Sequence, residues 1–231
     1  MISVLITGAN KGIGLEFCRQ LAARGDQVIA TCRRSTAELK SLRARIIEEV
    51  EMTSEESAAF LARDLGGLQI DWLILNAGTF ESAALGDLDF NRMRHEYDVD
   101  ALGPLRVIKA LLPNLFEGSK IALISSRAGS IGDNSSGGIY GYRMAKAALN
   151  MASVSLARDL LSRGIAVIAL HPGVVDTDLL RSSLDSLGHM VRPADAITPS
   201  TAAQEMLARI DELTLENSGR FMHRNGQVLP W

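Results

Sequence analysis

Cysteine, histidine and aromatic residues are scarce in this 231-residue chain. Its two cysteines, Cys18 and Cys32, are flanked by apolar or helix-like sequence, which argues against a disulfide framework and a thiolate metal site. The four histidines show no metal-ligand spacing with cysteines or carboxylates. We therefore expect no metal, and we interpret the low cysteine content as typical of a reducing cytoplasm.

Long hydrophobic runs and an excess of one charge are also missing. No run approaches the length needed to span a bilayer, and the N-terminal MISVLITGANKGIG has too short an apolar run for a signal peptide. The chain holds 24 basic and 27 acidic residues, for a net charge of −3. This balance gives no global attraction to nucleic acid or to an anionic membrane. We predict neither as a partner.

Short apolar runs alternate with stretches of helical periodicity. This pattern predicts an α/β fold: one Rossmann-type domain over 1–231, with a doubly wound parallel sheet and helices on both faces. Residues 178–198 have little sustained periodicity, so we expect a mobile loop that covers a substrate. The expected strands are 3–8, 27–32, 44–50, 71–78, 120–126, 165–173 and 219–222, and the expected helices lie near 13–24, 55–65, 88–116, 141–163 and 199–213.

A glycine-rich loop, TGANKGIG, joins the first expected strand to the first expected helix. Glycines there allow a tight turn and close backbone approach, and a helix N-terminus offers free N–H groups to a phosphate. The context favours a dinucleotide site over the alternative, a glycine-rich turn with no ligand.

The end of the second expected strand indicates which dinucleotide binds. An NAD site places an acidic residue there, but this strand ends in ATCRR, without a carboxylate. Arg33, with Lys11 from the glycine loop, can pair with a 2′-phosphate. We predict NADP(H) in preference to NAD(H). The alternative is that Arg33 and Arg34 are solvated loop charges.

Two tyrosines precede a lysine in GGIYGYRMAKAALNM. Tyr142 and Lys146 have i, i+4 spacing and share one helix face, whereas Tyr140 points to a different side. A free phenol has a pKa of about 10, so a nearby ammonium is needed before it shuttles protons well near neutrality. Tyr142 is therefore the candidate general acid/base, with Ser126 after the fifth strand as a further donor to a developing alkoxide.

The ordered set TGANKGIG, LNAG, ISS and YRMAK resembles the short-chain dehydrogenase/reductase family. SSRAGSIGDNSSGGIYGYRMAKAALNM and the ending SGRFMHRNGQVLPW are similar to its carbonyl-reductase branch, which includes sniffer and the bacterial C-factor proteins. By this resemblance Tyr142 is the general acid/base, Lys146 lowers its pKa and holds the nicotinamide ribose, and Ser126 orients the substrate oxygen. Ser125 is expected to point into the core, and Tyr140 to pack or line the pocket ahead of the helix.

The resemblance also implies a cofactor-binding set. Pro172 to Thr177 would hold the carboxamide of the nicotinamide, and Asn76 to Gly78 would line the cofactor, although each segment can equally be a simple strand-ending turn. The full set is Gly8, Asn10, Lys11, Gly12, Ile13, Gly14, Arg33, Glu51, Met52, Asn76, Ala77, Gly78, Tyr142, Lys146, Pro172, Gly173, Val175 and Thr177.

Two positions depart from the family pattern. Asp100 stands where the family usually has an asparagine associated with a helix kink and a water relay to the lysine. A carboxylate there can leave the relay intact, shift its pH profile or weaken it. Glu51 and Met52 stand where an Asp-Val pair usually meets the adenine, so we expect this contact to rest mainly on backbone groups.

These observations predict an NADPH-dependent reductase of ketones or aldehydes, which in reverse oxidises alcohols with NADP⁺. The alternatives are a dinucleotide-binding regulatory protein with little turnover, as the C-factor resemblance suggests, and a scaffold without cofactor. We expect Leu179, Leu180, Met190 and Val191 to favour a partly apolar small-molecule substrate. The family resemblance implies a homodimer through 102–115 and the Tyr142 helix.

Overall fold

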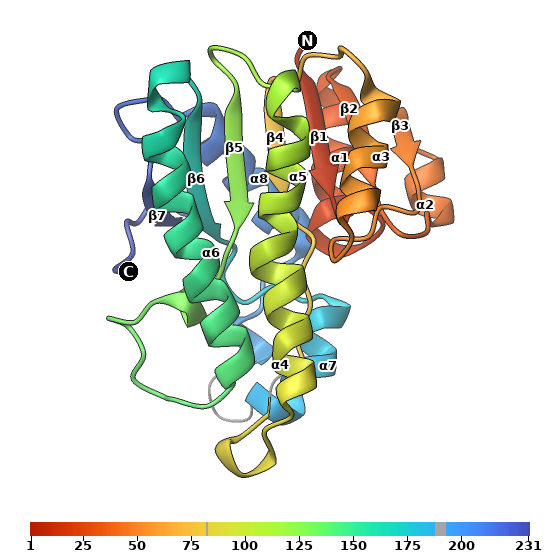
Figure 1. The fold of residues 1–231 in the computed structure, drawn as a ribbon. Coiled ribbons are helices and arrows are strands. Elements are labelled where there is room, and N and C mark those ends of the chain that lie inside the picture. Colours follow the sequence, from red (N-terminus) through yellow and green to blue (C-terminus); the bar gives the residue numbers. More distant parts are fainter. Residues whose placement is uncertain (82, 188–192) are drawn as a thin grey trace.

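Seven parallel strands form one sheet with the order β3-β2-β1-β4-β5-β6-β7 (Figure 1). The computed structural model describes residues 1–81, 83–187 and 193–231. The sheet confirms the predicted Rossmann-like α/β class. The strands are β1 Ser3–Thr7, β2 Gln27–Thr31, β3 Ala44–Ile47, β4 Trp72–Leu75, β5 Lys120–Ile124, β6 Ala166–His171 and β7 Arg220–His223.

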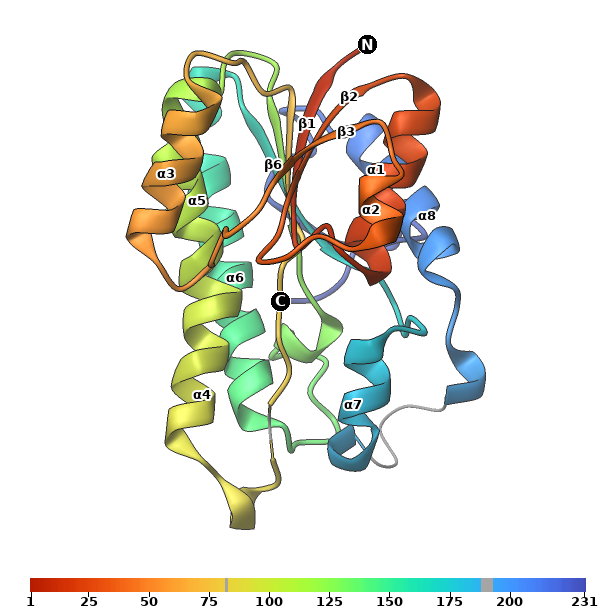
Figure 2. The same cartoon turned by 90° about the vertical axis from the view of Figure 1, so that its right-hand side faces the viewer.

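Helices cover both faces of the sheet. Figure 2 shows α1, α2 and α8 on one face and α3, α5 and α6 on the other, with α4 running on beyond α5. The helices are α1 Gly12–Arg24, α2 Ala37–Lys40, α3 Glu55–Leu65, α4 Phe90–Tyr97, α5 Gly103–Leu111, α6 Tyr140–Asp159, α7 Asp178–Leu187 and α8 Pro199–Asp211. Within the described ranges, no helix has both the length and the apolar character needed to cross a membrane.

The strands are apolar on both sides because each side faces a helical layer. In β1, Val4 and Ile6 belong to the core shared with α1 and α8, while Leu5 belongs to the core shared with α3 and α5. Successive strand residues point to opposite faces, so a strand buried on both sides has no polar alternation. This is why the sequence shows continuous apolar runs.

The strand order reverses between β1 and β4. The chain leaves β1 through α1 on one face, and it reaches β5 from β4 through α4 and α5 on the other. In open parallel sheets, such a reversal leaves a crevice at the carboxyl ends of the strands, where ligands bind. The glycine loop and the segment after β4 both lie at this edge.

Two expected elements differ from the structure. Residues 88–116, predicted as one helix, form α4, a π-helical turn over Asp98–Leu102, α5 and a 3-10 turn over Leu112–Asn114. The expected loop 178–198 instead begins with α7 and includes a 3-10 turn at Pro193–Asp195. The helix α7 has only 10 residues, too few for its periodicity to stand out from the irregular sequence around it. Met190 and Val191 lie outside the described residues.

Candidate active site

The glycine loop packs tightly against the segment that follows β4. A methyl group at Gly14 would lie 2.2 Å from the Gly8 carbonyl oxygen and 2.6 Å from Asn76 Nδ2. Asn76 Nδ2 itself donates to the carbonyl oxygens of Thr7 (3.1 Å) and Gly8 (3.2 Å). Asn76 therefore holds the loop in place, and Gly14 is needed for this close approach rather than for direct contact with the crevice.

The first cavity, of about 480 Å³, runs from this loop across the carboxyl ends of the strands. It is lined by most of the predicted cofactor residues: Gly8, Asn10, Lys11, Gly12, Ile13, Arg33, Glu51, Met52, Asn76, Ala77, Gly78, Tyr142, Lys146, Pro172 and Thr177. Gly173 and Val175 line the second cavity, described below, and Gly14 lines neither.

The start of α1 suits a phosphate. Several other helix starts are capped by side chains: Ser54 accepts from the Ser57 amide at α3, and Asp89 accepts from two amides at α4. At α1 the preceding residue, Lys11, makes no side-chain cap, and Gly12 and Ile13 at the start of the helix line the first cavity. Uncapped amides and the positive end of a helix dipole favour an anion there. The loop therefore fits the pyrophosphate of a dinucleotide.

At the β2 end of the first cavity, Arg33 faces a carboxylate. Its Nη1 lies 3.8 Å from Glu51 Oε2, and the Arg33 side chain is 77 % exposed. Met52 is buried, and a methyl group at Gly103 would lie 2.9 Å from its Cβ. Arg33 is thus free to reorient, while Met52 is packed against the start of α5.

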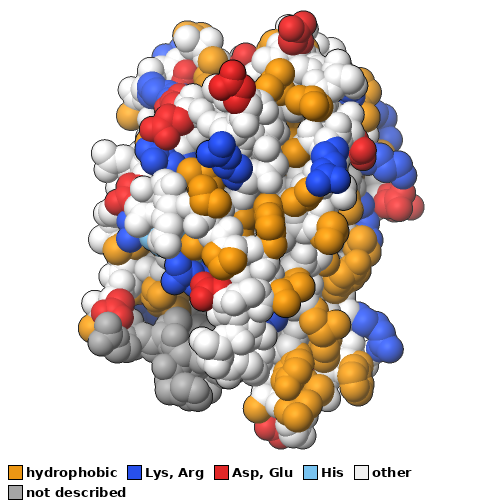
Figure 3. All heavy atoms as spheres, turned by 90° about the vertical axis from the view of Figure 1, so that its left-hand side faces the viewer, with side chains coloured by type: hydrophobic (Ala, Val, Ile, Leu, Met, Phe, Trp, Pro, Cys, Tyr) orange, Lys and Arg blue, Asp and Glu red, His pale blue; other side chains and the backbone are white. Residues whose placement is uncertain are grey.

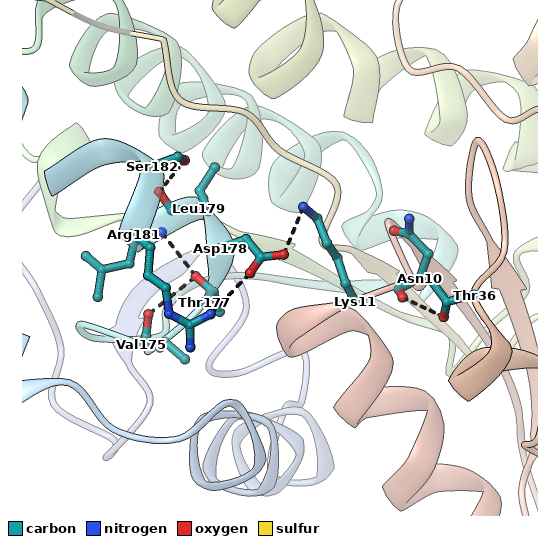
Figure 4. A network of polar contacts seen from close by, with 10 residues as sticks. Asn10, Lys11, Thr36, Val175, Thr177, Asp178, Leu179, Arg181 and Ser182 are labelled. Carbon is teal, nitrogen blue, oxygen red and sulfur yellow. Dashed lines mark hydrogen bonds and ion pairs between the residues drawn. The ribbon is translucent and has the colours of Figure 1, made fainter. Parts of the chain in front are cut away.

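Figure 4 shows a polar network that joins the glycine loop to α7. Lys11 Nζ lies 3.3 Å from Asp178 Oδ2, and Arg181 pairs with Asp176 (2.8 Å) and Asp178 (3.2 Å). Thr177 accepts from the Leu180 amide at the start of α7. The first residues of α7 therefore form part of the first cavity. Asp178 carries no recognisable motif, so its place in this cavity could not be predicted from the sequence.

Tyr142 and Lys146 lie side by side on α6, as their spacing predicts. Lys146 Nζ is 5.6 Å from the centre of the Tyr142 ring, and it donates to the Ile124 carbonyl oxygen at 3.2 Å. A methyl group at Gly129 would lie 2.5 Å from the Lys146 carbonyl carbon, so the turn after β5 sits directly on α6. This contact brings the end of β5 and the lysine together.

The paired serines after β5 both line the second cavity, but their hydroxyl groups make different hydrogen bonds. Ser125 is buried, and its hydroxyl donates to Asn150 Oδ1 on α6 at 2.6 Å. Ser126 Oγ accepts from the Ala128 amide at 3.2 Å, and Ser126 lines the second cavity with Tyr142. Tyr140 is the first residue of α6, half-exposed, and is among the described lining residues of neither cavity. Its expected place ahead of the helix was wrong.

Asp100 is fully buried in the π-helical turn Asp98–Leu102. Its Oδ2 lies 3.1 Å from Lys146 Nζ, and its Oδ1 accepts from the Thr79 amide at 2.8 Å. A π-turn inserts one residue into a helix and locally redirects its side chains. The helix is therefore irregular at this position, and the carboxylate meets the lysine directly.

The second cavity, of about 440 Å³, adjoins the first and shares Ile13, Ser125, Tyr142, Pro172, Thr177 and Leu179 with it. Ser126 and Tyr142 stand at one side, and Phe80, Leu179 and Leu180 add apolar surface. Of the apolar residues predicted to face a substrate, Leu179 and Leu180 do line this cavity. Two adjoining spaces, with a phenol between them, suit a two-reactant reaction.

The family model for short chain dehydrogenase matches residues 3–187. The chain belongs to the short-chain dehydrogenase/reductase family. A Rhodococcus protein named 1-hydroxy-2-glutathionyl-2-methyl-3-butene dehydrogenase is 41% identical over 233 residues, covering 100% of both chains. C-signal of Myxococcus xanthus is 42% identical over 165 residues, covering 70% of this chain and 93% of that protein.

Solved carbonyl reductases have the same fold. The NADPH-bound carbonyl reductase from chicken fatty liver has a TM-score of 0.85 at 30% identity, covering 100% of this chain and 99% of that one. Carbonyl reductase Sniffer of Drosophila melanogaster has a TM-score of 0.87 at 27% identity, with both chains covered in full. These likenesses confirm the resemblance to the sniffer and C-factor branch, and oxidoreduction with a nicotinamide dinucleotide is the chemistry that the family supports.

The buried charges of this family member act on one another. Burial raises the pKa of Tyr142 and Asp100 adds to the rise, while Lys146 and a hydrogen bond with Ser126 act in the opposite direction. Burial acts to lower the pKa of Lys146, but Asp100 and Tyr142 outweigh it, so this pKa is raised. Burial raises the pKa of Asp100 against the opposing effect of Lys146. Lys146 therefore stays protonated, and Tyr142 remains a neutral phenol near neutral pH.

A second buried carboxylate in this short-chain dehydrogenase, Glu96, was missed by the sequence analysis. It lies one helical turn before Asp100 on α4 and is fully buried. Glu96 Oε1 accepts from the Glu81 amide at 2.7 Å, as Asp100 accepts from Thr79. Between these two anchored amides, the Phe80 ring lies 4.9 Å from the Tyr142 ring, centre to centre. The two carboxylates thus fix the segment that places Phe80 in the second cavity.

Proposed function

We propose that the protein reduces a ketone or aldehyde with NADPH and oxidises the corresponding alcohol in reverse. The observation that carries this proposal is the position of Tyr142, whose ring lines both cavities and lies beside the buried Lys146 ammonium. A protein that only bound a dinucleotide would not need a phenol at the place where the two cavities meet. The NADPH-bound chicken carbonyl reductase supports the assignment of the first cavity to the cofactor.

Four side chains have different roles in the proposed reduction. Tyr142 donates its phenolic proton to the carbonyl oxygen, and the Ser126 hydroxyl donates a hydrogen bond to the same oxygen. Bound NADPH supplies the hydride for the carbonyl carbon. Lys146 stabilises the phenolate that remains and holds the nicotinamide ribose, and Asp100 keeps Lys146 charged and in place. The raised pKa of Tyr142 keeps its proton available, which favours reduction near neutral pH.

The direct test of this mechanism is Tyr142→Phe, which removes one hydroxyl and keeps the ring against Phe80. General acid catalysis contributes about 10²–10⁴-fold, so we expect kcat for reduction to fall by at least about 100-fold. Tyr140→Phe is the matched control and should retain activity. NADPH binding, measured by fluorescence, should be retained in both variants. Undiminished carbonyl-dependent NADPH oxidation in Tyr142→Phe would refute the mechanism.

For the cofactor, we propose NADP(H) over NAD(H), with the 2′-phosphate bound by Arg33 and Lys11 and the other predicted residues along the first cavity. To bind a 2′-phosphate, Arg33 must first break its ion pair with Glu51. This pair is exposed and its atoms are 3.8 Å apart, so breaking it costs little free energy. In Arg33→Asp we expect the ratio of kcat/KM with NADPH to that with NADH to fall by about tenfold or more. An unchanged ratio would contradict the assignment, and Arg34→Asp serves as the control.

The competing proposal is a regulatory protein that binds the dinucleotide with little turnover, and similarity to C-signal is the observation that favours it. The presence of Ser126, Tyr142 and Lys146 together at one junction favours the enzyme. Purified protein that binds NADPH but reduces no member of a broad carbonyl panel would support the regulatory role.

We also propose a homodimer in the cytoplasm. Figure 3 shows a band of hydrophobic side chains on one face of the molecule, and the exposed apolar residues of α4 and α6 include Phe90, Tyr97, Met144 and Met151. A hollow of about 560 Å³ between these two helices is lined by Phe90, Tyr97 and Met144. Exposed apolar surface of this kind favours association. Light scattering of the purified chain tests for a dimer.

A further inference from the structure

The second cavity has two chemically different walls. One is apolar and consists of Phe80, Ile139, Leu179 and Leu180. The other comes from the stretch between β5 and α6 and from the first turn of α6, and its polar members are Arg127, Asp133, Ser135, Ser136 and Arg143. A cavity for a simple aliphatic or aromatic ketone needs only the first wall and the reacting groups. The second wall indicates that the substrate also has a polar part.

The charge on the polar wall is positive. Among the described lining residues of this cavity, the ionised side chains are Arg127, Arg143 and Asp133, two cations against one anion. His171 also lines it, but burial, with His223 and Arg127 nearby, lowers its pKa to about 3, so it is neutral. Arginine in a partly enclosed site binds carboxylates with planar, charge-assisted hydrogen bonds.

The two arginines are held differently. Arg143 is anchored, because it donates to the carbonyl oxygens of Gly137 (3.0 Å), Gly138 (3.2 Å) and Ala128 (3.2 Å) and to Ser136 Oγ (2.8 Å). Its position is therefore fixed relative to Tyr142, the preceding residue.

Arg127 has an ion-pair partner that a ligand can replace. Its Nε lies 3.0 Å from Asp133 Oδ2, and the two side chains are 47% and 39% exposed. An ion pair this accessible to water contributes little, so an incoming carboxylate can take the place of Asp133. Asp133 would then act as a stand-in for the acidic group of a ligand.

We propose that the substrate carries a carboxylate on an apolar body, with its carbonyl at Tyr142, its apolar part against Phe80 and Leu179, and its carboxylate on Arg127 and Arg143. This deepens the proposed carbonyl reduction and rests on it. The polar wall then selects among carbonyl compounds by charge, with Arg127 as the specificity-determining residue.

The test uses matched pairs that differ only in charge: 4-acetylbenzoate and 4-acetylbenzamide, 4-oxo-4-phenylbutanoate and its amide, and 5-oxohexanoate and its amide. With NADPH, kcat/KM should favour the acid by about tenfold or more in at least one pair, the ratio that one charge-assisted contact gives. Raising the salt concentration should reduce that preference, because the site is partly exposed.

Three variants separate the causes. Arg127→Met should abolish the preference for the acid, Arg127→Lys should restore part of it, and Asp133→Asn should increase it. In Arg127→Met the kcat/KM for the acids should fall more than that for the matched amides, and circular dichroism checks that all three variants are folded. Equal kcat/KM for acid and amide in every pair, or an undiminished preference in Arg127→Met, would overturn the inference while leaving carbonyl reduction intact. Turnover of no carbonyl compound by protein that binds NADPH would refute the proposed function itself.

Discussion

Replacing Asp100 with asparagine removes a buried negative charge and keeps the side chain's shape. Asp100 Oδ2 is 3.1 Å from Lys146 Nζ, which is 5.6 Å from the Tyr142 ring centre, so the carboxylate lies within about 9 Å of the ring. At an effective dielectric constant of about 20, two unit charges at that separation repel by about 1.8 kcal/mol. Asp100 and Lys146 are almost fully buried, so solvent screens this interaction little.

Alcohol oxidation needs the phenolate of Tyr142, so its rate rises with pH up to the pKa of Tyr142. Asp100 raises that pKa. Asp100→Asn should therefore lower it and move the rising limb to lower pH. Below that limb, the phenolate fraction should increase by about 20-fold, the factor that corresponds to 1.8 kcal/mol. Reduction should show the converse, with a loss of activity that begins at lower pH.

The measurement is kcat/KM for NADP⁺-dependent alcohol oxidation from pH 6 to 11 in both proteins. Asp98→Asn is the control, because that carboxylate lies in the same π-helical turn but pairs with Arg106 at 2.6 Å. An unmoved profile, or one displaced to higher pH, would refute the reasoning. Displacement to higher pH would mean that Lys146 loses its proton once Asp100 is gone.

Two further predictions concern residues that support the site. Gly14→Ala places a methyl group 2.2 Å from the Gly8 carbonyl oxygen, so it should lower the free energy of unfolding in urea by about 1–3 kcal/mol and weaken NADPH binding. Gly86→Ala is the control, because its methyl group would have nothing within 4 Å, and it should do neither. Equal stability of the two variants would contradict the packing described. Glu96→Ala should free the Phe80 segment and raise KM for carbonyl substrates by about tenfold. Glu96→Gln can still accept from the Glu81 amide, so it should keep KM within about twofold. Identical KM values in the two variants would exclude this positioning role.

The sheet and the central pair of the site follow from short-range rules. Strands buried on both faces read as continuous apolar runs, and i, i+4 spacing was enough to put Tyr142 and Lys146 on one face of α6. Successive residues of a strand point to opposite faces of the sheet, and this explains why Ser125, just after β5, meets Asn150 in the core. The residues that line the first cavity were mostly predicted by family resemblance, since a glycine-rich turn has no unique ligand.

The features that were missed depend on contacts between segments far apart in sequence. Asp178 meets Lys11 across 167 residues, and α7 is recognised only when it is placed beside the glycine loop. Glu96 lies four residues before Asp100, and this i, i+4 spacing was the available signal for it. The π-helical turn that directs Asp100 inward has no local sequence pattern comparable to a cap or a glycine turn.

Arg143 joins the proton donor to the stretch that builds the polar wall. It follows Tyr142 on α6, and its guanidinium holds the backbone at Ala128, Gly137 and Gly138, while residues 131–136 between them are largely exposed. The two ends of this stretch are thus fastened to the helix that carries the phenol, and its middle is exposed, with the Gly132 amide donating to the Trp231 carbonyl oxygen at 2.8 Å. Insertions or substitutions in 131–136 can therefore change which molecules enter while leaving the proton donor undisturbed, so this is the place where directed evolution for new substrates should begin.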